Sequence, residues 1–420
     1  MREMKDSGVQ WIGAIPVDWK IDNPKYHFTQ RKDRAKPGMV QLTASQKYGV
    51  ITQTEYMERT GANIVTVEKD FDILKLVRAG DFVIHMRSFQ GGLEYSEKTG
   101  STSSAYVMLI PHSTICEPRY YKWFFKSSNY IDALSSTSNL VRDGQAMRWA
   151  NFIQLPIPFP PASEQRHIAD FLDTKCAEID ALTADIQTQI DTLEQYKRSV
   201  ITETVTKGLN PDVEMKDSGI QWIGNMPAHW DVIRGKYILR YMQKPVREDD
   251  GVITCFRDGE VTLRSNRRED GFTMSDKEIG YQGIDVGDLV VHGMDGFAGS
   301  IGISDSRGKA SPVLNVLDTD QCKRYIMYYL RSMAYSDVFL ALATGIRVRS
   351  CDLRWNKLAE LSYPVPPLDE QNAIVKHIDS VLSKADAVIA DKKAQLATLD
   401  EYKKSLIFEY VTGKKEVPTS

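Results

Sequence analysis

The chain contains one long segment twice. The stretch MKDSGVQWIGAIPVDW at residues 4–19 returns as MKDSGIQWIGNMPAHW at residues 215–230, 211 positions later. A second stretch, MRWANFIQLPIPFPPASEQ at 147–165, returns as LRWNKLAELSYPVPPLDEQ at 353–371, 206 positions later. Such a small drift is what short insertions in the variable middle of a copy produce. The chain is therefore two large copies of one unit, which excludes a solenoid of many short repeats.

Further repeated segments show that the repeat covers the whole chain. GDFVIH at 80–85 returns as GDLVVH at 287–292, and LEQYKRSVITETVT at 193–206 returns as LDEYKKSLIFEYVT at 399–412. Six of the seven tryptophans fall in matched pairs, and only Trp123 is single. The sequence predicts a pseudo-dimer within one polypeptide.

The first part of each copy predicts a globular module of the α/β (α+β) class. Short β-type runs such as DFVIH and AYVMLI are separated by Gly, Asp and Ser turns. Longer stretches such as PRYYKWFFKSSNYIDALSS have helical periodicity. We place module 1 at residues 1–161 and module 2 at residues 211–367.

The second part of each copy predicts a long helix. The segments PFPPASEQ and YPVPPLDEQ combine a proline stop with a helix-start signal, so we expect helices at 162–210 and 368–415. A seven-residue apolar repeat follows each start, which is typical of a coiled-coil seam. In the first helix we place Ile168, Leu182 and Tyr196 on a second row of positions seven residues apart, interleaved along the sequence with the first row of the seam. The predicted seam comprises Leu172, Ile179, Ile186, Leu193, Val200, Leu382, Ile389, Leu396, Leu399 and Leu406.

One helix cannot bury its own apolar stripe, so the two long helices must be partners. Forty-odd residues at 1.5 Å per residue make a rod of roughly 65 Å. The intervening module returns the chain to its starting side, which makes an antiparallel pair the simplest topology. We therefore expect two similar modules separated by two antiparallel coiled-coil helices, with pseudo-twofold symmetry that suits a twofold target such as double-stranded DNA.

Composition narrows the functional classes. With 42% apolar and 26% charged residues, and no run of about 18 apolar residues, the chain is expected in the cytoplasm. The five scattered cysteines predict neither disulfides nor a metal site. No catalytic constellation and no glycine-rich cofactor loop is recognisable, so we expect no catalytic, cofactor-binding or metal-binding residues.

The net charge of −3 hides an uneven distribution of charge. Residues 20–150 carry 18 Lys and Arg against 13 Asp and Glu, whereas residues 163–206 carry 4 against 9. Basic and amide side chains in loops can hold phosphates and read base edges. A solvated basic face is the alternative for any single cluster. The candidate DNA-binding residues are Arg31, Lys32, Arg34, Lys36, Ser45, Gln46, Lys47, Arg87, Ser88, Gln90, Arg142, Gln145, Arg148, Lys244, Arg247, Arg257, Arg264, Asn266, Arg267, Arg268, Arg347, Arg349 and Arg354.

The combined motifs resemble a known family. The pattern PPxxEQ, followed by LxxYKxS[VL]I and VT, with MKDSG[VI]QWIGx[IM]PxxW before each module, is similar to the specificity (S) subunit of type I restriction–modification systems. This resemblance implies that each module is a target recognition domain for one half of an asymmetric, bipartite DNA site. It also implies that the helices set the half-site spacing and dock methyltransferase subunits.

The resemblance further implies a chain that is not an enzyme. Its expected partners are double-stranded DNA, two methyltransferase (M) subunits and the restriction/translocase (R) subunits, with no membrane. S-adenosylmethionine and ATP with Mg would be bound by those partner subunits, and no cofactor by this chain. A coiled-coil scaffold that organises protein partners without reading DNA is the alternative, and the heptads suit it equally well.

Overall fold

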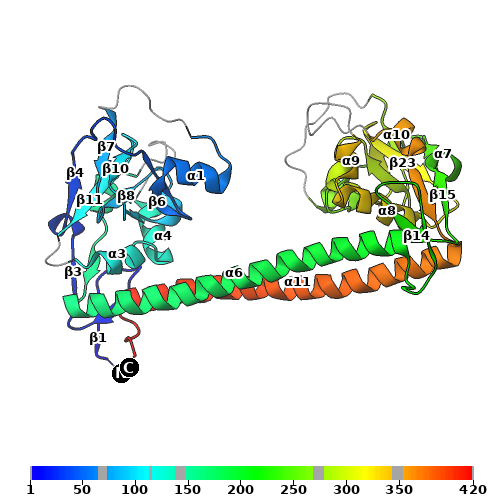
Figure 1. Cartoon of the computed structure of the whole chain (residues 1–420). Helices are drawn as coiled ribbons and strands as arrows, with labels where there is room; N and C mark the ends of the chain where they lie inside the picture. The colour runs from blue at the N-terminus through cyan, green and yellow to red at the C-terminus, as the bar shows by residue number, and fades with distance from the viewer. Residues whose placement is uncertain are drawn as a thin grey trace. The chain divides into compact units, whose positions relative to one another are not determined.

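The structure is a computed structural model that describes residues 2–64, 73–112, 116–137, 147–267, 279–342 and 353–418. Its internal packing divides the chain into two compact units. Unit 1 comprises Met1–Ile186 together with Ala394–Ser420, and unit 2 comprises Gln187–Lys393. Each unit therefore combines one module with part of each long helix (Figure 1).

Module 1 is built on a four-stranded antiparallel sheet of order β4-β11-β8-β9. Two-stranded antiparallel pairs, β1-β2, β3-β12, β5-β6 and β7-β10, complete the strands. The strand bounds are β1 (Met4–Asp6), β2 (Ala14–Pro16), β3 (Lys20–Asp22), β4 (Phe28–Arg31), β5 (Leu42–Ser45), β6 (Gly49–Thr52), β7 (Lys75–Val77), β8 (Phe82–Ile84), β9 (Glu94–Tyr95), β10 (Gly100–Thr102), β11 (Val107–Pro111) and β12 (Ile157–Phe159).

Short helices connect these strands in module 1. Thr52 caps α1 through a reciprocal pair of bonds with Glu55, and Gly61 ends that helix in the left-handed conformation. The helical elements of module 1 are η1 (Pro24–Tyr26), α1 (Gln53–Thr60), α2 (Ser88–Gly91), α3 (Pro118–Phe124), α4 (Ser128–Ser136) and α5 (Trp149–Phe152).

Module 2 repeats the strand order of module 1. Its four-stranded sheet is β16-β23-β20-β21, and its pairs are β13-β14, β15-β24, β17-β18 and β19-β22. The elements are β13 (Met215–Asp217), β14 (Asn225–Pro227), β15 (Asp231–Arg234), α7 (Gly235–Ile238), β16 (Arg240–Met242), β17 (Ile253–Cys255), β18 (Val261–Leu263), η3 (Arg264–Asn266), β19 (Gln282–Ile284), β20 (Leu289–His292), η4 (Gly296–Ala298), β21 (Ile301–Ile303), β22 (Gly308–Ala310), β23 (Leu314–Asp318), α8 (Lys323–Tyr335), α9 (Val338–Ala341), α10 (Trp355–Glu360) and β24 (Ser362–Val365). The expected α/β repeat is thus observed in the strand pairing.

Two long helices run antiparallel beside each other within each unit. They are α6 (Ala162–Lys207) and α11 (Leu368–Val411). In unit 1 the Asp180 carboxylate accepts from Lys403 Nζ at 2.6 Å, and in unit 2 the Asp386 carboxylate accepts from Lys197 Nζ at 2.6 Å. Both partners of the second pair lie 206 positions from their counterparts in the first. The same ion pair thus recurs at equivalent positions in both units, between the antiparallel helices drawn in Figure 1.

The seam between the helices uses a different interleaved row on α6 than the heptads suggested. Leu182 and Tyr196 are 48% and 51% exposed, so their predicted place in the interleaved row was wrong, whereas Ile168 of the same row is buried in the core of unit 1. Cys176 and Ile190 are buried instead, four residues after Leu172 and Ile186. A seven-residue repeat fixes one row of seam residues, but the second row can follow the first by three or by four residues. In α6 the second row follows the first by four residues.

The other seam positions face the partner helix to different degrees. Five of these ten residues are buried and five are half-buried. Buried are Leu172, Ile179, Ile186, Ile389 and Leu406, and half-buried are Leu193, Val200, Leu382, Leu396 and Leu399.

Each module packs on both helices. The core of module 1 joins Phe28, Phe82 and Tyr120 to Leu172 of α6 and Leu406 of α11. The core of module 2 likewise joins its sheet and α8 to Ile201 and Val205 of α6 and to Ile374 and Ile378 of α11. The helices are therefore part of each module's hydrophobic core.

The repeated opening segment forms the connection between helix end and module. In unit 1 it folds into the β1-β2 hairpin, and Trp19, which follows, is fully buried with its indole N–H on Glu164 at 2.9 Å. Gly413, just after α11, has φ of +69° and lies so close to Pro16 that a Cβ would stand 2.6 Å from the proline ring. Trp230 is also fully buried in unit 2, but its indole N–H has no hydrogen-bond partner among the described residues. These tryptophans are core residues.

The described part of the chain contains no helix that is long and apolar enough to cross a bilayer. The same residues contain no group of three or more His, Cys, Asp or Glu side chains arranged to hold a metal ion.

Candidate nucleic-acid interface

Arg31, the first candidate, lies inside module 1. Its guanidinium donates to both carboxylate oxygens of Asp81, at 2.6 and 2.8 Å, and to Asp33 at 3.0 Å. Only 9% of the residue is exposed. A guanidinium that neutralises a buried carboxylate is not available to a phosphate, so Arg31 joins β4 to the turn before β8 and has a structural role.

Two further candidates are also structural. Lys244 Nζ lies 2.9 Å from the Asp285 carboxylate and 2.6 Å from that of Asp288, and Arg307 extends this network from Asp285 to Asp250. Ser88 is fully buried, and its hydroxyl accepts from the His85 N–H at 2.9 Å. All three candidates were selected from the sequence by residue type. Residue type alone does not distinguish a polar side chain that stabilises the fold from one that binds DNA.

The hairpin loop of module 1 brings several candidates together. Gln46 Nε2 donates to the carbonyl of Arg87 at 3.0 Å, which ties the β5-β6 turn to the loop before α2. Lys47 lies over the ring of Tyr48 at 5.2 Å. Gln46, Lys47, Arg87 and Gln90 are exposed, and Ser45 is half-exposed. This hairpin-loop cluster contains the mixture of cations, amides and an aromatic face that phosphates and bases bind.

Arg59 belongs to the same cluster and was missed from sequence. It is exposed at the end of α1, and its guanidinium lies 5.3 Å from the Tyr48 ring centre, beside Lys47. Its position after a capped helix gave no signal until the fold placed that helix beside the hairpin.

The remaining described candidates of module 1 lie apart from this cluster. Lys32, Arg34 and Lys36 are exposed on the segment after β4, where Arg34 Nη1 donates to the carbonyl of Ile73 at 2.8 Å. Arg148 is exposed at the N-terminus of α5. Arg142 and Gln145 lie outside the described residues.

Three arginine candidates of module 2 line one hollow of about 690 Å³. Arg257 and Arg267 are exposed and Arg264 is half-buried, and all three follow or border the β17-β18 hairpin. Asp258 and Asp295 line the same hollow. This arginine-lined hollow is the counterpart in module 2 of the hairpin-loop cluster, because both are built around the corresponding hairpin.

The arginines of this hollow are held in place by exposed ion pairs. Arg257 lies 3.0 Å from Asp295, and Arg267 lies 2.6 Å from Asp258 and over the Phe256 ring at 4.2 Å. Exposed pairs contribute only about 0.2–1 kcal/mol each. A DNA phosphate can therefore replace such a carboxylate partner at little cost.

His292 and Ser300 also line the hollow and were missed from sequence. His292 Nδ1 accepts from the backbone N–H groups of Met294 and Asp295, at 3.2 and 2.9 Å, so the neutral ring carries its proton on Nε2. Burial lowers the pKa of His292, which favours that neutral form. The Ser300 hydroxyl is buried and has no hydrogen-bond partner among the described residues. The half-buried His292 ring can donate from Nε2 to a base edge, whereas the Ser300 hydroxyl has no exposed surface with which to contact one.

The other candidates of module 2 are dispersed. Arg247 and Arg354 are exposed, and Arg354 precedes α10. Asn266 is exposed and donates to the Thr262 hydroxyl at 2.9 Å. Arg268, Arg347 and Arg349 lie outside the described residues.

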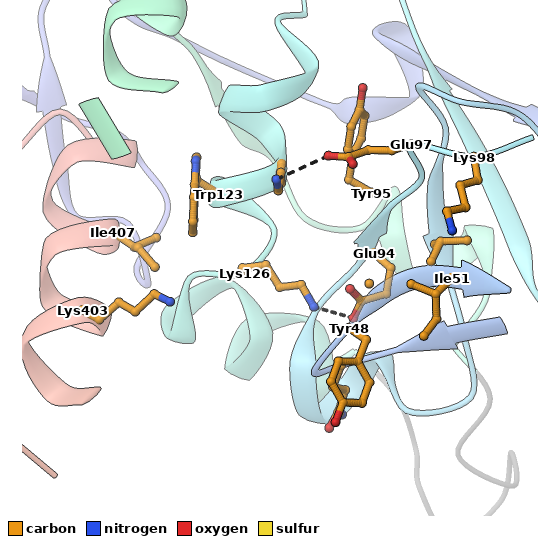
Figure 2. A pocket seen from close by; sticks show the side chains of 14 residues that line it. Tyr48, Ile51, Glu94, Tyr95, Glu97, Lys98, Trp123, Lys126, Lys403 and Ile407 are labelled. Carbon is orange, nitrogen blue, oxygen red and sulfur yellow. Dashed lines mark hydrogen bonds and ion pairs between the residues drawn. The ribbon is translucent and has the colours of Figure 1, made fainter. Parts of the chain in front are cut away.

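Unit 1 also has a hollow of about 440 Å³ beside its hairpin, shown in Figure 2. Four lysines line it, but each has an acidic partner. Lys126 lies against Glu94, and Lys122 lies 3.9 Å from Glu97. The other two pairs are Lys98 with Glu55 and Lys403 with Asp180. Because Glu94 is buried, its lysine partner is fixed, and this hollow is a poorer phosphate site than the exposed hairpin-loop cluster.

Known proteins resemble this chain over most of its length. Residues 20–192 match the family described as Type I restriction modification DNA specificity domain. The putative type I restriction enzyme MjaX specificity subunit of Methanocaldococcus jannaschii is 24% identical over 442 residues, covering 97% of this chain and 96% of the relative. The MjaVIII specificity subunit of the same organism is 22% identical, covering 96% and 94%.

A solved structure has the same fold. A chain from work described as the structural basis underlying complex assembly and conformational transition of the type I R-M system matches with a TM-score of 0.66 and 14% identity. The match covers 96% of this chain and 99% of the other.

Proposed function

We propose that this chain, which belongs to the family of type I restriction–modification DNA specificity subunits, reads two different half-sites with its two modules. Module 1 would use the hairpin-loop cluster, and module 2 the arginine-lined hollow. Phosphate contacts would set affinity and salt dependence, and contacts to base edges would set the sequence.

One observation supports unlike half-sites: the two modules share a strand order but differ in the groups that it presents. The hairpin of module 1 carries Gln46, Lys47 and Tyr48 in its turn, whereas that of module 2 carries Arg257 and Asp258. Amide, lysine and tyrosine side chains offer different donors and acceptors from an arginine and an aspartate. Two modules that share a strand order but present different side chains favour an asymmetric, bipartite DNA target.

We place the chemistry on partner subunits. The chain would act as a non-catalytic component that brings DNA to two methyltransferase subunits and to ATP-dependent restriction subunits. S-adenosylmethionine and ATP with Mg would then be bound by those partners. The helix pair would fix the distance between half-sites and dock the methyltransferase subunits.

Exchange of one module tests this proposal. Residues 20–150 are replaced by the equivalent segment of a relative with a different specificity, and methylated motifs are mapped by sequencing genomic DNA. We expect only one half of the motif to change. A change in both halves of the motif, or in neither, would refute the proposal that each module reads one half-site.

The scaffold alternative is not favoured by the DNA specificity domain match. It makes a separate prediction, since a scaffold that does not touch DNA would show no binding of random duplex whose log K falls linearly with log salt concentration. Gel shifts with the methyltransferase subunits present, at several salt concentrations, distinguish the two.

A further inference from the structure

The glycine-rich segment 293–302 of module 2 packs against the turn of the β17-β18 hairpin. Gly299 has φ of +95°, and a Cβ on it would stand 2.7 Å from the carbonyl oxygen of Arg257. A Cβ on Gly302 would stand 1.9 Å from the carbonyl oxygen of Gly259. Only glycine permits so close an approach of two backbones. The glycines therefore fix the hairpin turn against the loop that precedes β21.

This packing brings together one arginine and one carboxylate that lie 38 residues apart in the chain. The Arg257 guanidinium donates from Nη2 to Asp295 Oδ1 at 3.0 Å. Both side chains line the arginine-lined hollow, where 63% of the Arg257 side chain and 35% of the Asp295 side chain are exposed. The backbone N–H of Asp295 donates to His292 Nδ1 at 2.9 Å, which fixes the loop from its other side. An exposed ion pair adds little to stability, so stability alone does not explain a pair that is held this firmly.

The other two arginines of the hollow are held by the fold. Arg264 is half-buried, and its Nε donates to the Thr254 hydroxyl at 2.9 Å. Arg267 lies 2.6 Å from the Asp258 carboxylate. The positive charge of these arginines attracts phosphates to the hollow. The side chain of Arg257 has one hydrogen-bonding partner among the described residues, so its remaining N–H groups are the ones that can reach a base edge.

The Arg257–Asp295 pair offers hydrogen-bond donors and an acceptor in a fixed order. A guanidinium beside a carboxylate presents a fork of donors followed by an acceptor. In the major groove a G·C pair presents two adjacent acceptors, guanine N7 and O6, followed by a donor, the cytosine N4 amino group. An A·T pair alternates acceptor, donor and acceptor, so one arm of the same guanidinium would meet the adenine N6 amino group. The pair is therefore complementary to G·C and mismatched to A·T.

Module 1 differs at the equivalent position. Ser88 corresponds to Asp295, because each lies three residues after a matched histidine, His85 in module 1 and His292 in module 2. The Ser88 hydroxyl is fully buried and accepts from the His85 N–H at 2.9 Å. Module 1 thus has a buried hydroxyl where module 2 has a carboxylate that reaches solvent, and the pairing of arginine with aspartate belongs to module 2.

We infer that the Arg257–Asp295 pair reads a G·C base pair in the half-site of module 2. Arg257 donates to guanine N7 and O6, and Asp295 accepts from the cytosine N4 amino group. The five N–H donors of an arginine suffice for the guanine and the aspartate together. Arg264 and Arg267 lie close enough to hold the neighbouring phosphates. The inference rests on the proposed function, because it names a base pair that one module recognises.

Exchange of single base pairs tests the inference. The methylated motif is mapped by sequencing, and the module exchange described above assigns its halves. The natural chain, assembled with the methyltransferase subunits, is then bound to duplexes in which each base pair of the motif is exchanged in turn. We expect one G·C pair in the half-site of module 2 whose exchange for A·T weakens binding at least about tenfold.

Two variants assign that base pair to its reader. Arg257→Ala should remove the discrimination at this G·C pair and leave discrimination in the half-site of module 1 unchanged. Asp295→Ala should relax the same base pair, and the double variant should lose no more discrimination than the larger single loss. Both side chains reach solvent, so we expect neither change to alter thermal unfolding. Loss of discrimination at two different base pairs would show that the two residues do not act as one reader.

A matched control removes another exposed arginine of module 2. Arg240 is paired with the carboxylates of Asp318 and Asp320, outside the hollow, and Arg240→Ala should keep the discrimination. A half-site of module 2 without a required G·C pair would overturn the inference. So would an Arg257→Ala variant that binds all duplexes uniformly more weakly with a salt slope reduced by about 1, because Arg257 would then contact a phosphate. Either result leaves the reading of half-sites by the modules intact, whereas a complex that bound no DNA would refute the proposed function itself.

Discussion

The hydroxyl of Tyr120 in α3 donates to the main-chain carbonyl of Val411, at 2.7 Å, where α11 ends. Tyr325 in α8 lies in the same position, with its hydroxyl shared between the carbonyls of Val205, near the end of α6, and Pro364, both at 3.0 Å. Each tyrosine is fully buried. The last carbonyls of a helix have no hydrogen-bond donor within the helix. Each module therefore supplies a donor, a tyrosine hydroxyl from its own core, to the long helix that ends beside it.

Removing this hydroxyl should destabilise unit 1. Tyr120→Phe leaves the Val411 carbonyl buried without its donor, and we expect a loss of about 1–2 kcal/mol in the free energy of unfolding. Urea denaturation followed by tryptophan fluorescence measures it. Tyr130→Phe is the control, because the buried Tyr130 hydroxyl has no hydrogen-bond partner among the described residues. Equal losses in both variants would show that the Val411 bond contributes nothing.

A second prediction concerns Lys392, a polar residue in the seam. Its ammonium donates to Gln189 Oε1, whereas the equivalent position on α6 is the buried Ile186. A polar residue at such a position specifies register at a cost in stability. Lys392→Ile should therefore stabilise unit 2 by about 1 kcal/mol through added apolar burial. Thermal unfolding is the measurement, and Lys393→Ile at the exposed neighbouring position should give no gain.

A third prediction separates structural from DNA-binding cations. Arg31→Leu leaves Asp81 buried without its partner and should destabilise unit 1 by about 3 kcal/mol or more. Lys47→Ala and Arg87→Ala should leave stability unchanged and weaken DNA binding, with the slope of log K against log salt concentration reduced by about 1 each. Binding is measured with the methyltransferase subunits present. A normal salt slope in the Lys47 and Arg87 variants would remove the hairpin-loop cluster from the interface.

A fourth prediction follows from the ion-pair network of module 2. Lys244, and then Arg307, lower the pKa of Asp285 from 3.8 to about 2. A depressed pKa means that the contribution is complete above the ordinary value and is lost as the pH falls toward 2. Because 43% of the Asp285 side chain is exposed, we expect Asp285→Asn to cost only about 1 kcal/mol at pH 7.

Denaturation at pH 7, 4 and 3 checks the sign of this effect. The difference between Asp285→Asn and the natural chain should shrink as the pH falls. Asp249→Asn, at a nearby exposed position, is the control and should show no such convergence. A difference that grew toward low pH would contradict the assignment of the network.

The repeat made the architecture predictable, whereas tertiary contacts decided the details. Matched segments 206 to 211 residues apart required two equivalent modules and two equivalent helices, and periodicity identified the helices. Periodicity did not distinguish Cys176 from the exposed Leu182, because a heptad is compatible with either spacing. The antiparallel direction of pairing followed from the order of the segments, whereas the register of the pair is visible only in contacts such as Asp180 with Lys403.

The candidate interface was predictable in outline for a related reason. Loop position and residue type identified Gln46, Lys47 and Arg87, which the structure brings together. The same criteria selected Arg31 and Lys244, whose acidic partners are distant in sequence. A charge that is neutralised by a residue 40 or 50 positions away cannot be recognised from its own neighbourhood. Arg59 was missed because only the folded chain places the end of α1 beside the hairpin.

The last prediction concerns the helix pair as a spacer between half-sites. One heptad inserted after Gln187 in α6 and another after Lys393 in α11 preserve both seams, because seven residues restore the same face. Each helix gains about 10.5 Å, since a helix rises 1.5 Å per residue. That length equals about three base pairs at 3.4 Å each. Methylated motifs in cells carrying this variant should keep both half-site sequences and have a gap longer by about three base pairs. Insertion into α6 alone breaks the register set by Lys197 with Asp386 and should abolish methylation. An unchanged gap in the double insertion would exclude the helices as the spacer.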